Sequence, residues 1–181
     1  MTGVQTCALP IYINEFNGGQ YCILQDQEKL PVVGIPVFLH RRFRHGFIFI
    51  NRNAGIHKPS DLDGRRIGMN SYGPAAHYWM RGLLEEDFGV PHRSVTYVLE
   101  RREDIMPAVW PEDLKTEYLP KGMDVEKMLL AGEIDAIFSP GVMKEVAEGD
   151  PRAGHLWDNY KEVEKDYFRR TGFFQIGRAH V

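Results

Sequence analysis

Apolar segments and polar turns alternate along this chain, and one unit is especially clear. Residues 66–69 have the pattern of a short buried strand, and residues 70–73 form a small polar loop. Pro74 suits the first turn of a helix, where its missing N–H costs nothing. Apolar residues then recur with helical spacing up to Gly89, which is a suitable helix end. The pattern therefore predicts a strand, a loop and a helix in direct succession.

The same criteria divide the rest of the chain. Residues 32–38 are a continuous apolar run, typical of a strand buried on both faces, whose pairing should end near Pro36. Strands alternate with helices throughout, which predicts an α/β fold with mostly parallel pairing. We expect further strands at residues 47–51, 94–99, 116–119, 134–138 and from 172, a helical turn at 59–62, and helices at 20–28, 125–130 and 159–170.

The two ends of the chain differ from its middle. Residues 1–11 resemble the translation of a short-read sequencing adapter, and residues 176–181 resemble its reverse complement. We therefore expect residues 1–12 and 176–181 to be adapter-derived and exclude them from fold reasoning. On this interpretation the remaining sequence is an internal piece of a longer gene.

Composition narrows the classes of partner. A hydrophobic fraction of 43% and an aromatic fraction of 12% suit a globular core. The net charge of -3 gives no bulk attraction to nucleic acid, and no apolar run approaches the roughly 18 residues of a membrane span. Outside the adapter-like ends Cys22 stands alone, and we expect it to be a small buried hydrophobe. The sequence thus predicts no nucleic-acid partner, no membrane span, no cofactor and no metal.

The loop before the helix is a candidate anion site. Backbone N–H groups at a helix N-terminus and the helix dipole favour a carboxylate or phosphate. An ordinary strand-to-helix connection is an equal alternative. His77, in the first turn, is expected to be structural or exposed rather than catalytic. The candidate binding residues here are Asn70, Ser71, Tyr72 and Gly73.

A second candidate is the densest cationic patch of the chain, residues 40–45. It follows the expected strand at 32–38, and open α/β sheets bind ligands at strand ends. The guanidinium of Arg41 or Arg44 can hold a carboxylate with two parallel hydrogen bonds. A solvated charged loop is again an equal alternative. Ser139 begins another loop after an expected strand, where a ligand could lie.

In order and spacing, these segments resemble the 4,5-dihydroxyphthalate decarboxylase family, which is related to type 2 periplasmic binding proteins and to solute receptors of ABC transporters. The resemblance covers residues 13–174. The residues that carry it are Glu15, Tyr21, 35–38, Arg41, 43–45, 53–56, Pro59, Asp61, Leu62, Gly64, Arg66, Gly68, Tyr72, Ala76, Trp79, Arg81, Gly82, 132–136, 149–152 and 160–172.

The resemblance implies two lobes with a ligand cleft between them. Residues 13–57 would belong to the first lobe, 58–170 would form the second, and 171–175 would return to the first. The chain would cross between lobes near residues 51–55 and again near Thr171, and such a fold closes on its ligand.

The resemblance also implies a decarboxylase, a carboxy-lyase acting on a hydroxylated aromatic carboxylate in the cytoplasm. Arg41 and Arg44 would hold the carboxylate that stays, and His45 would supply a proton to the ring carbon. Ser71 or Tyr72 would orient the phenol. The alternative is a periplasmic receptor that delivers a small carboxylate to a transporter permease, since the same groups would serve binding alone.

This chain departs from the family at two places. The usual central loop, Glu-Tyr-Gln-Met-Thr-Ala, is Ser-Tyr-Gly-Pro-Ala-Ala at residues 71–76, and the usual proline and serine before the arginine are Leu39 and His40. The family's glutamate carboxylate and threonine hydroxyl are therefore missing from the loop expected to touch the ligand, which leaves the choice of substrate open.

Overall fold

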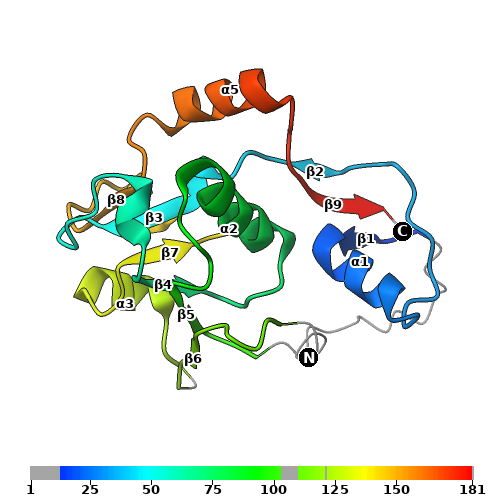
Figure 1. Ribbon diagram of the computed structural model, residues 1–181, viewed down its shortest axis with the longest axis horizontal. Helices are drawn as coiled ribbons and strands as arrows, with labels where there is room; N and C mark the ends of the chain where they lie inside the picture. Colours follow the sequence, from blue (N-terminus) through cyan, green and yellow to red (C-terminus); the bar gives the residue numbers. More distant parts are fainter. Residues whose placement is uncertain (1–12, 103–109, 121, 181) are drawn as a thin grey trace.

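The computed structural model describes residues 13–102, 110–120 and 122–180, which form two β-sheets (Figure 1). The larger has six strands in the order β6-β5-β4-β7-β3-β8, and the smaller has the order β1-β9-β2. The strands are β1 (Glu15–Asn17), β2 (His40–Arg41), β3 (Ile48–Asn51), β4 (Arg66–Met69), β5 (Thr96–Leu99), β6 (Thr116–Tyr118), β7 (Ala136–Phe138), β8 (Ala153–His155) and β9 (Ile176–His180).

The α/β class predicted from the sequence is confirmed, but the large sheet is mixed rather than mostly parallel. β4 runs parallel to β5 and β7, and β5 runs parallel to β6. β3 runs antiparallel to both of its neighbours, β7 and β8. β3 thus pairs within the large sheet and not with the N-terminal strands, and the lobe boundary expected after residue 57 stays a prediction.

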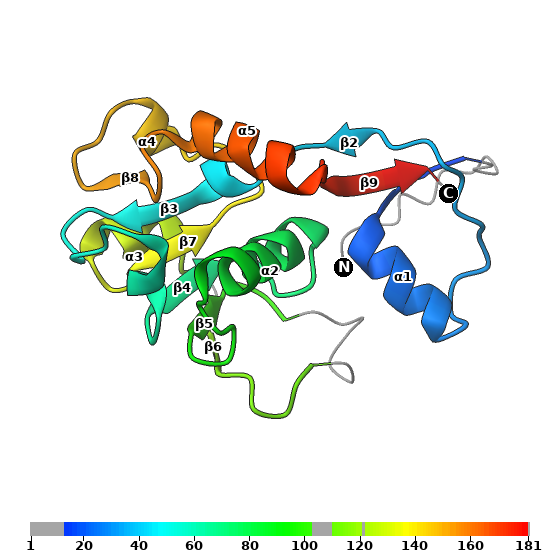
Figure 2. The ribbon, with the colours of Figure 1, turned by 45° about the horizontal axis from the view of Figure 1, so that its top comes forward.

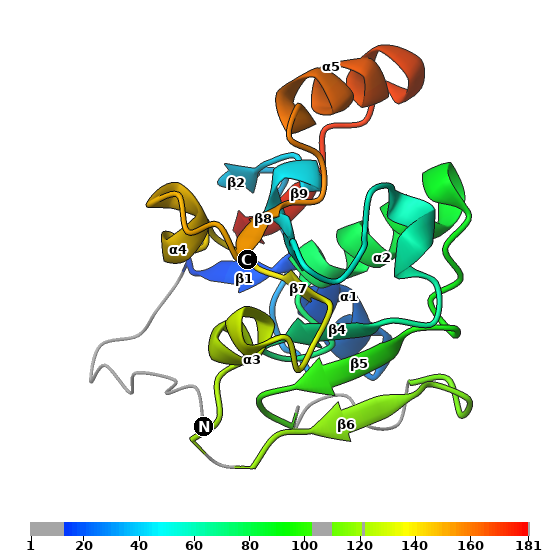
Figure 3. The same cartoon turned by 90° about the vertical axis from the view of Figure 1, so that its left-hand side faces the viewer.

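Helices cover both faces of the large sheet (Figure 3). Side chains alternate along each strand, so Ile67 and Met69 pack with α2 (Ala75–Phe88) on one face, in the core that contains Met80. On the other face α3 (Val125–Ala131) lies close to β4. A Cβ on Gly68 would approach Val125 Cβ to 2.9 Å, so only glycine lets this helix pack so near.

The predicted helix boundaries are largely confirmed. Pro74 directly precedes α2, and its carbonyl accepts the N–H groups of His77 and Tyr78. Gly89 ends α2 with φ +66° and Gly132 ends α3 with φ +78°, in the left-handed region that favours glycine. The other helical segments are α1 (Gly18–Asp26), η1 (His45–Phe47), η2 (Pro59–Leu62), α4 (Lys144–Ala147) and α5 (Tyr160–Thr171).

Two segments, residues 42–44 and 172–175, cross between the sheets. They adjoin β2 and β9, which lie side by side beyond the end of α5 (Figure 2). The N–H of Arg42 donates to the carbonyl of Gln175 over 3.1 Å, and the rings of Phe43 and Phe174 are 4.7 Å apart. The first crossing between the two sheets thus comes before β3, and the crossing between lobes near residues 51–55 stays a prediction. The strand expected from residue 172 begins instead at Ile176, and β9 consists of residues that we expect to be adapter-derived.

Residues 32–38 do not form the buried strand that the sequence predicts. No strand is assigned to them, and Val33 is 79% exposed. The side chains of α1 hold this segment instead: Gly34 donates its N–H to the Tyr21 hydroxyl over 2.8 Å. An apolar run becomes a buried strand only where a neighbouring strand offers pairing, and no described strand lies beside it. Cys22, expected to be buried, is exposed.

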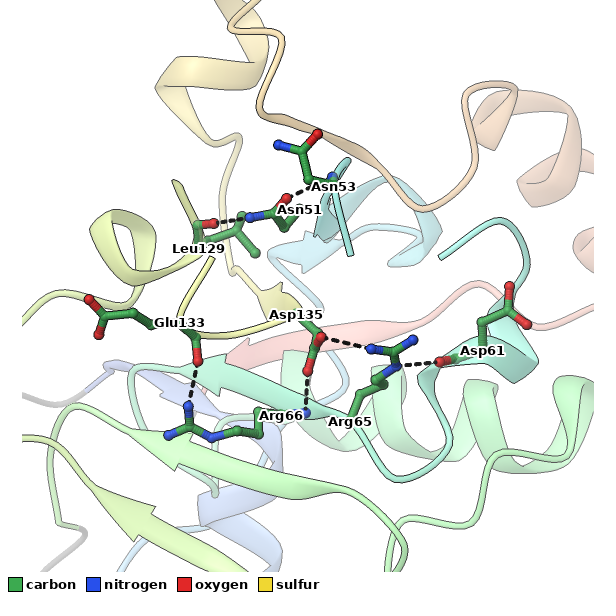
Figure 4. A network of polar contacts seen from close by, with 8 residues as sticks. All are labelled: Asn51, Asn53, Asp61, Arg65, Arg66, Leu129, Glu133 and Asp135. Carbon is green, nitrogen blue, oxygen red and sulfur yellow. Dashed lines mark hydrogen bonds and ion pairs between the residues drawn. The ribbon is translucent and has the colours of Figure 1, made fainter. Parts of the chain in front are cut away.

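A network of polar contacts joins the first residues of β4 to the segment just before β7 (Figure 4). Asp135 accepts the backbone N–H of Arg66 over 2.9 Å and pairs with the Arg65 guanidinium over 3.1 Å. Asn51, at the end of β3, donates to the Leu129 carbonyl over 2.6 Å. These bonds fix the register of three strands at one end of the sheet.

Candidate functional site

Three chain segments meet at the opposite end of the large sheet. β4 and β7 are parallel neighbours, so the loops that follow them emerge at the same edge. β3 is antiparallel to β7, so the turn before it reaches that edge too, where the Ser139 N–H donates to the Phe47 carbonyl over 3.0 Å. Open α/β sheets bind ligands at such an edge. The structure thus brings the loops at residues 70–74 and 139–141 together with the turn at 44–47.

Arg44 is a buried cation at this edge, only 3% exposed. Its Nη1 donates to the Pro140 carbonyl over 3.4 Å, and its guanidinium lies 5.6 Å from the Phe47 ring centroid. Its Nε has no hydrogen-bond partner, and no ion pair joins Arg44 to a carboxylate within the described residues. Burial, with the nearby charge of Arg42, lowers the pKa of Arg44 to about 10. A buried guanidinium without a carboxylate favours an anionic ligand.

His45 contacts a different part of the molecule, beneath α5. Its ring is fully buried and lies 5.5 Å from the Trp157 ring and 5.1 Å from the Tyr167 ring. Among the described residues neither ring nitrogen has a hydrogen-bond partner, and burial lowers the pKa of His45 to about 4. The imidazole is therefore neutral at pH 7. Although Arg44 and His45 are adjacent in sequence, the structure gives their side chains different surroundings.

The α5 helix fits closely on the turn that carries these two residues. Glu164 accepts the Gly46 N–H over 3.2 Å, and a Cβ on Gly46 would lie 2.5 Å from the Tyr160 ring. Only glycine allows the helix to approach this far. Packing of α5 therefore fixes the turn, and with it the position of Arg44.

The loop between β4 and α2, residues 70–74, is called the central loop here. Its residues 71–73 are buried, and side chains of α2 hold it in place. Ser71 is 1% exposed and Tyr72 is 5% exposed. The Ser71 carbonyl lies 2.7 Å from His77 Nδ1, and the Tyr72 carbonyl accepts from Arg81 Nη1 over 2.8 Å. The Arg81 guanidinium also lies 3.7 Å from the Tyr72 ring centroid. Burial raises the pKa of the Tyr72 hydroxyl, which is therefore protonated at neutral pH.

The first N–H of α2 is already occupied by a residue that the sequence did not single out. Asn17 Oδ1 accepts the Ala75 N–H over 3.2 Å and, as the cap of α1, also the N–H groups of Gly19 and Gln20. Asn17 before two glycines is a signal for the cap of α1, but its bond to α2 is a tertiary contact that local patterns do not reveal.

The remaining predicted site residues are Arg41, Ser139 and Asn70. Arg41 is exposed on β2, and its Nη2 donates to the Phe174 carbonyl over 3.1 Å. Ser139 Oγ accepts the Gly141 N–H over 3.3 Å, and Asn70 Oδ1 lies 3.5 Å from Ser71 Oγ. The structure thus assembles Arg44, Ser139 and the central loop, while Arg41 and His45 point elsewhere.

Groups of metal-ligating side chains and membrane-spanning helices were sought in the part of the chain that the structure describes. No cluster of three or more histidine, cysteine, aspartate or glutamate side chains there could hold a metal ion. None of its helices combines the length and apolar character required to cross a bilayer.

Known proteins resemble this chain over most of its length. The family model described as NMT1/THI5 like matches residues 16–110. A protein of Comamonas testosteroni named 4,5-dihydroxyphthalate decarboxylase is 28% identical over 169 residues, covering 91% of this chain and 51% of that protein. One of the same name from Pseudomonas putida is 31% identical over 167 residues, covering 89% and 64%. The chain thus spans about half to two thirds of the length of these curated relatives.

Two solved structures show a weaker likeness. The periplasmic aliphatic sulphonate binding protein SsuA from Escherichia coli has a TM-score of 0.48 at 14% identity, over 93% of this chain and 46% of that one. The amino acid ABC transporter substrate-binding protein AbpA from Streptococcus pneumoniae, bound to L-arginine, has a TM-score of 0.30 at 13% identity, over 75% and 57%. Both TM-scores are too low to decide the architecture.

Proposed function

The chain belongs to the NMT1/THI5-like family, and from that premise we propose that the protein containing it decarboxylates a hydroxylated aromatic carboxylate similar to 4,5-dihydroxyphthalate. The observation that carries the proposal is the shared name of two curated relatives, which match 91% and 89% of this chain. The buried guanidinium of Arg44 supports it, because an aromatic dicarboxylate needs a cation to hold one carboxylate in place.

The reaction breaks the bond between a ring carbon and the carboxylate carbon that leaves as carbon dioxide. The electron pair of that bond stays on the ring carbon, which then takes up a proton. In our proposal Arg44 holds the carboxylate that stays, and Ser71 or Tyr72 orients the phenol so that its electrons assist. A drier site would favour loss of the leaving carboxylate, and the burial of all three residues is consistent with this.

We further propose that His45 supplies the proton. Because the pKa of its buried imidazole is about 4, only about one molecule in a thousand carries the imidazolium at pH 7. Donation would then become faster as the pH falls, and access to the ring carbon would require His45 to be uncovered from α5.

The whole protein would have two lobes, with the edge that carries Arg44 and the central loop facing the ligand cleft. A decarboxylase of this kind would work in the cytoplasm. A leader sequence in the complete gene would instead indicate a periplasmic receptor.

The test is to mix the protein with 4,5-dihydroxyphthalate and measure release of carbon dioxide. Phthalate is the matched control, because it keeps both carboxylates but lacks the hydroxyls that assist the reaction. Release from the hydroxylated compound alone is the expected result. Binding of both compounds without release would overturn the enzyme and favour a receptor that passes a carboxylate to a transporter permease. Absence of binding would overturn both functions.

A further inference from the structure

Two side chains of α2, one turn apart, reach back to the central loop. His77 Nδ1 lies 2.7 Å from the Ser71 carbonyl oxygen, and Arg81 Nη1 donates to the Tyr72 carbonyl over 2.8 Å. His77 is fully buried and Arg81 is 6% exposed. A carbonyl oxygen only accepts hydrogen bonds, so Nδ1 of His77 carries the hydrogen.

His77 is neutral in this position. Burial lowers its pKa to about 3, and the nearby charges of Arg81 and Arg44 act in the same direction. The main chain of Phe138 also lies near the ring, and Nε2 has no hydrogen-bond partner among the described residues. The ring thus lies near the ends of both β4 and β7, and its hydrogen bond to the Ser71 carbonyl requires the Nδ1–H tautomer.

The two carbonyl contacts determine where the loop presents its N–H groups. No peptide bond in the described residues is cis, and in a trans peptide the N–H points opposite to the C=O. The Ser71 carbonyl shares its peptide with the Tyr72 N–H, and the Tyr72 carbonyl shares the next with the Gly73 N–H. Both N–H groups therefore point away from the side chains of α2.

These two N–H groups have no acceptor in the described part of the protein, although Tyr72 and Gly73 are both buried. Buried N–H groups are nearly always paired in native proteins. Two successive N–H groups that point the same way form a small concavity for an anionic oxygen. Arg44 stands at the same edge of the sheet, in the turn before β3, and its buried Nε has no hydrogen-bond partner among the described residues.

We propose that His77 is a positioning residue that, with Arg81, turns the N–H groups of Tyr72 and Gly73 toward a carboxylate of the ligand. This deepens the proposed function and rests on it for the ligand class, an aromatic dicarboxylate. In this proposal the Arg44 guanidinium supplies positive charge, and the two N–H groups of the loop orient the carboxylate. Gly73 and Pro74 have no polar side chains, so in this proposal the loop binds through its backbone.

The test compares two amides at position 77. His77→Asn places an amide nitrogen near the position of Nδ1 and keeps the donor to Ser71. His77→Gln places it near Nε2 and removes that donor. With phthalate as the probe, we expect the Kd of His77→Asn to stay within about threefold of the unsubstituted chain and that of His77→Gln to rise about tenfold or more.

Nitrogen NMR of the unsubstituted chain keeps the proposal testable if either variant fails to fold. The expected result is a neutral Nδ1–H tautomer of His77 between pH 5 and 8, with phthalate shifting the Tyr72 and Gly73 amide signals. An Nε2–H tautomer, unshifted amides or equal affinities for the two variants would overturn the proposal. Shifted amides without release of carbon dioxide from 4,5-dihydroxyphthalate would overturn only the enzymatic function.

Discussion

The two ends of the six-stranded sheet are built in opposite ways. Where β4 and β7 begin, the charged groups are partly exposed and satisfied by one another: Arg65 is 37% and Asp135 is 22% exposed, and they pair over 3.1 Å (Figure 4). Where the same strands end, Arg44, His45 and His77 are each at most 3% exposed. Nitrogens of all three lack a hydrogen-bond partner within the described residues.

This difference separates stability from function. A buried polar group without a partner lowers the free energy of unfolding by about 1–3 kcal/mol, so the second end destabilises the fold. A ligand that provides the missing acceptors offsets that cost, whereas the first end needs no ligand. Substitutions at the first end should therefore change the free energy of unfolding, and substitutions at the second end should change binding or turnover.

The largest effect is expected at His45. His45→Gln should reduce turnover of 4,5-dihydroxyphthalate by about 100-fold or more, since it removes a general acid, while phthalate binding is spared. Because the pKa of His45 is about 4, the rate of the unsubstituted protein should rise as the pH falls from 7 toward 4. Steady-state kinetics across this range is the measurement. The exposed His57→Gln serves as control, and full turnover in His45→Gln would remove His45 from the reaction.

Arg44 should have the next largest effect. Arg44→Ala should weaken phthalate binding by about 1.5–3 kcal/mol, because it removes charge-assisted hydrogen bonds in a buried site. Isothermal titration gives the Kd, and thermal unfolding checks that the variant folds. Arg41→Ala should have a smaller effect, since Arg41 is exposed on β2. If the affinity of a folded Arg44→Ala variant is unchanged, the second end has no carboxylate clamp at Arg44.

Local rules predicted the unit from β4 to α2 almost residue by residue. A short apolar run, a proline before the first turn and a glycine at the end each act through neighbours in sequence, and they hold regardless of the rest of the fold. The same is true of the helical turn Pro59–Leu62. The loop at residues 70–73 was singled out for this reason, since it follows a strand that forms. Arg44 was singled out beside the expected strand at 32–38, which does not form, and it reaches the same edge because it precedes β3.

The features that could not be predicted from the sequence depend on contacts between segments that are distant in the chain. Residues 32–38 have the apolar pattern of a buried strand, but burial needs a neighbour that the described chain does not provide. The antiparallel direction of β3 depends on its pairing with β7 and β8. The part played by His77 was also hidden, because its position in a helix does not reveal that it faces the Ser71 carbonyl.

Asp135 tests the first end of the sheet. Asp135→Ala should lower the free energy of unfolding by about 1–3 kcal/mol, since it leaves the Arg66 N–H and Arg65 Nη1 without their acceptor. Phthalate affinity should not change. Chemical denaturation is the measurement, and Asp158→Ala, which breaks an exposed pair with Arg52, should cost less than about 0.5 kcal/mol. A loss of affinity in Asp135→Ala would show that the two ends are coupled.

Substitution of Asn17 should have the smallest effect on stability. Its side chain accepts the Ala75 N–H at the second end, so it can separate a structural role of that N–H from a role in ligand binding. Its Oδ1 accepts N–H groups from Gly19, Gln20 and Ala75, at the starts of α1 and α2. Asn17→Ala should lower the free energy of unfolding by about 1 kcal/mol, the usual cost of a lost helix cap. Asn17→Asp keeps the acceptor and adds a negative charge near both helix starts, so it should restore stability.

The same pair of variants shows what the Ala75 N–H does for the ligand. If that N–H is a structural donor, Asn17→Ala changes unfolding and leaves the Kd of phthalate within about threefold. If phthalate uses it, the affinity rises in Asn17→Ala, where the donor is released, and falls in Asn17→Asp, where a fixed carboxylate competes. Titration of both variants, with Asn14→Ala as the exposed control, therefore decides whether the anion site ends at Gly73 or extends into the first turn of α2.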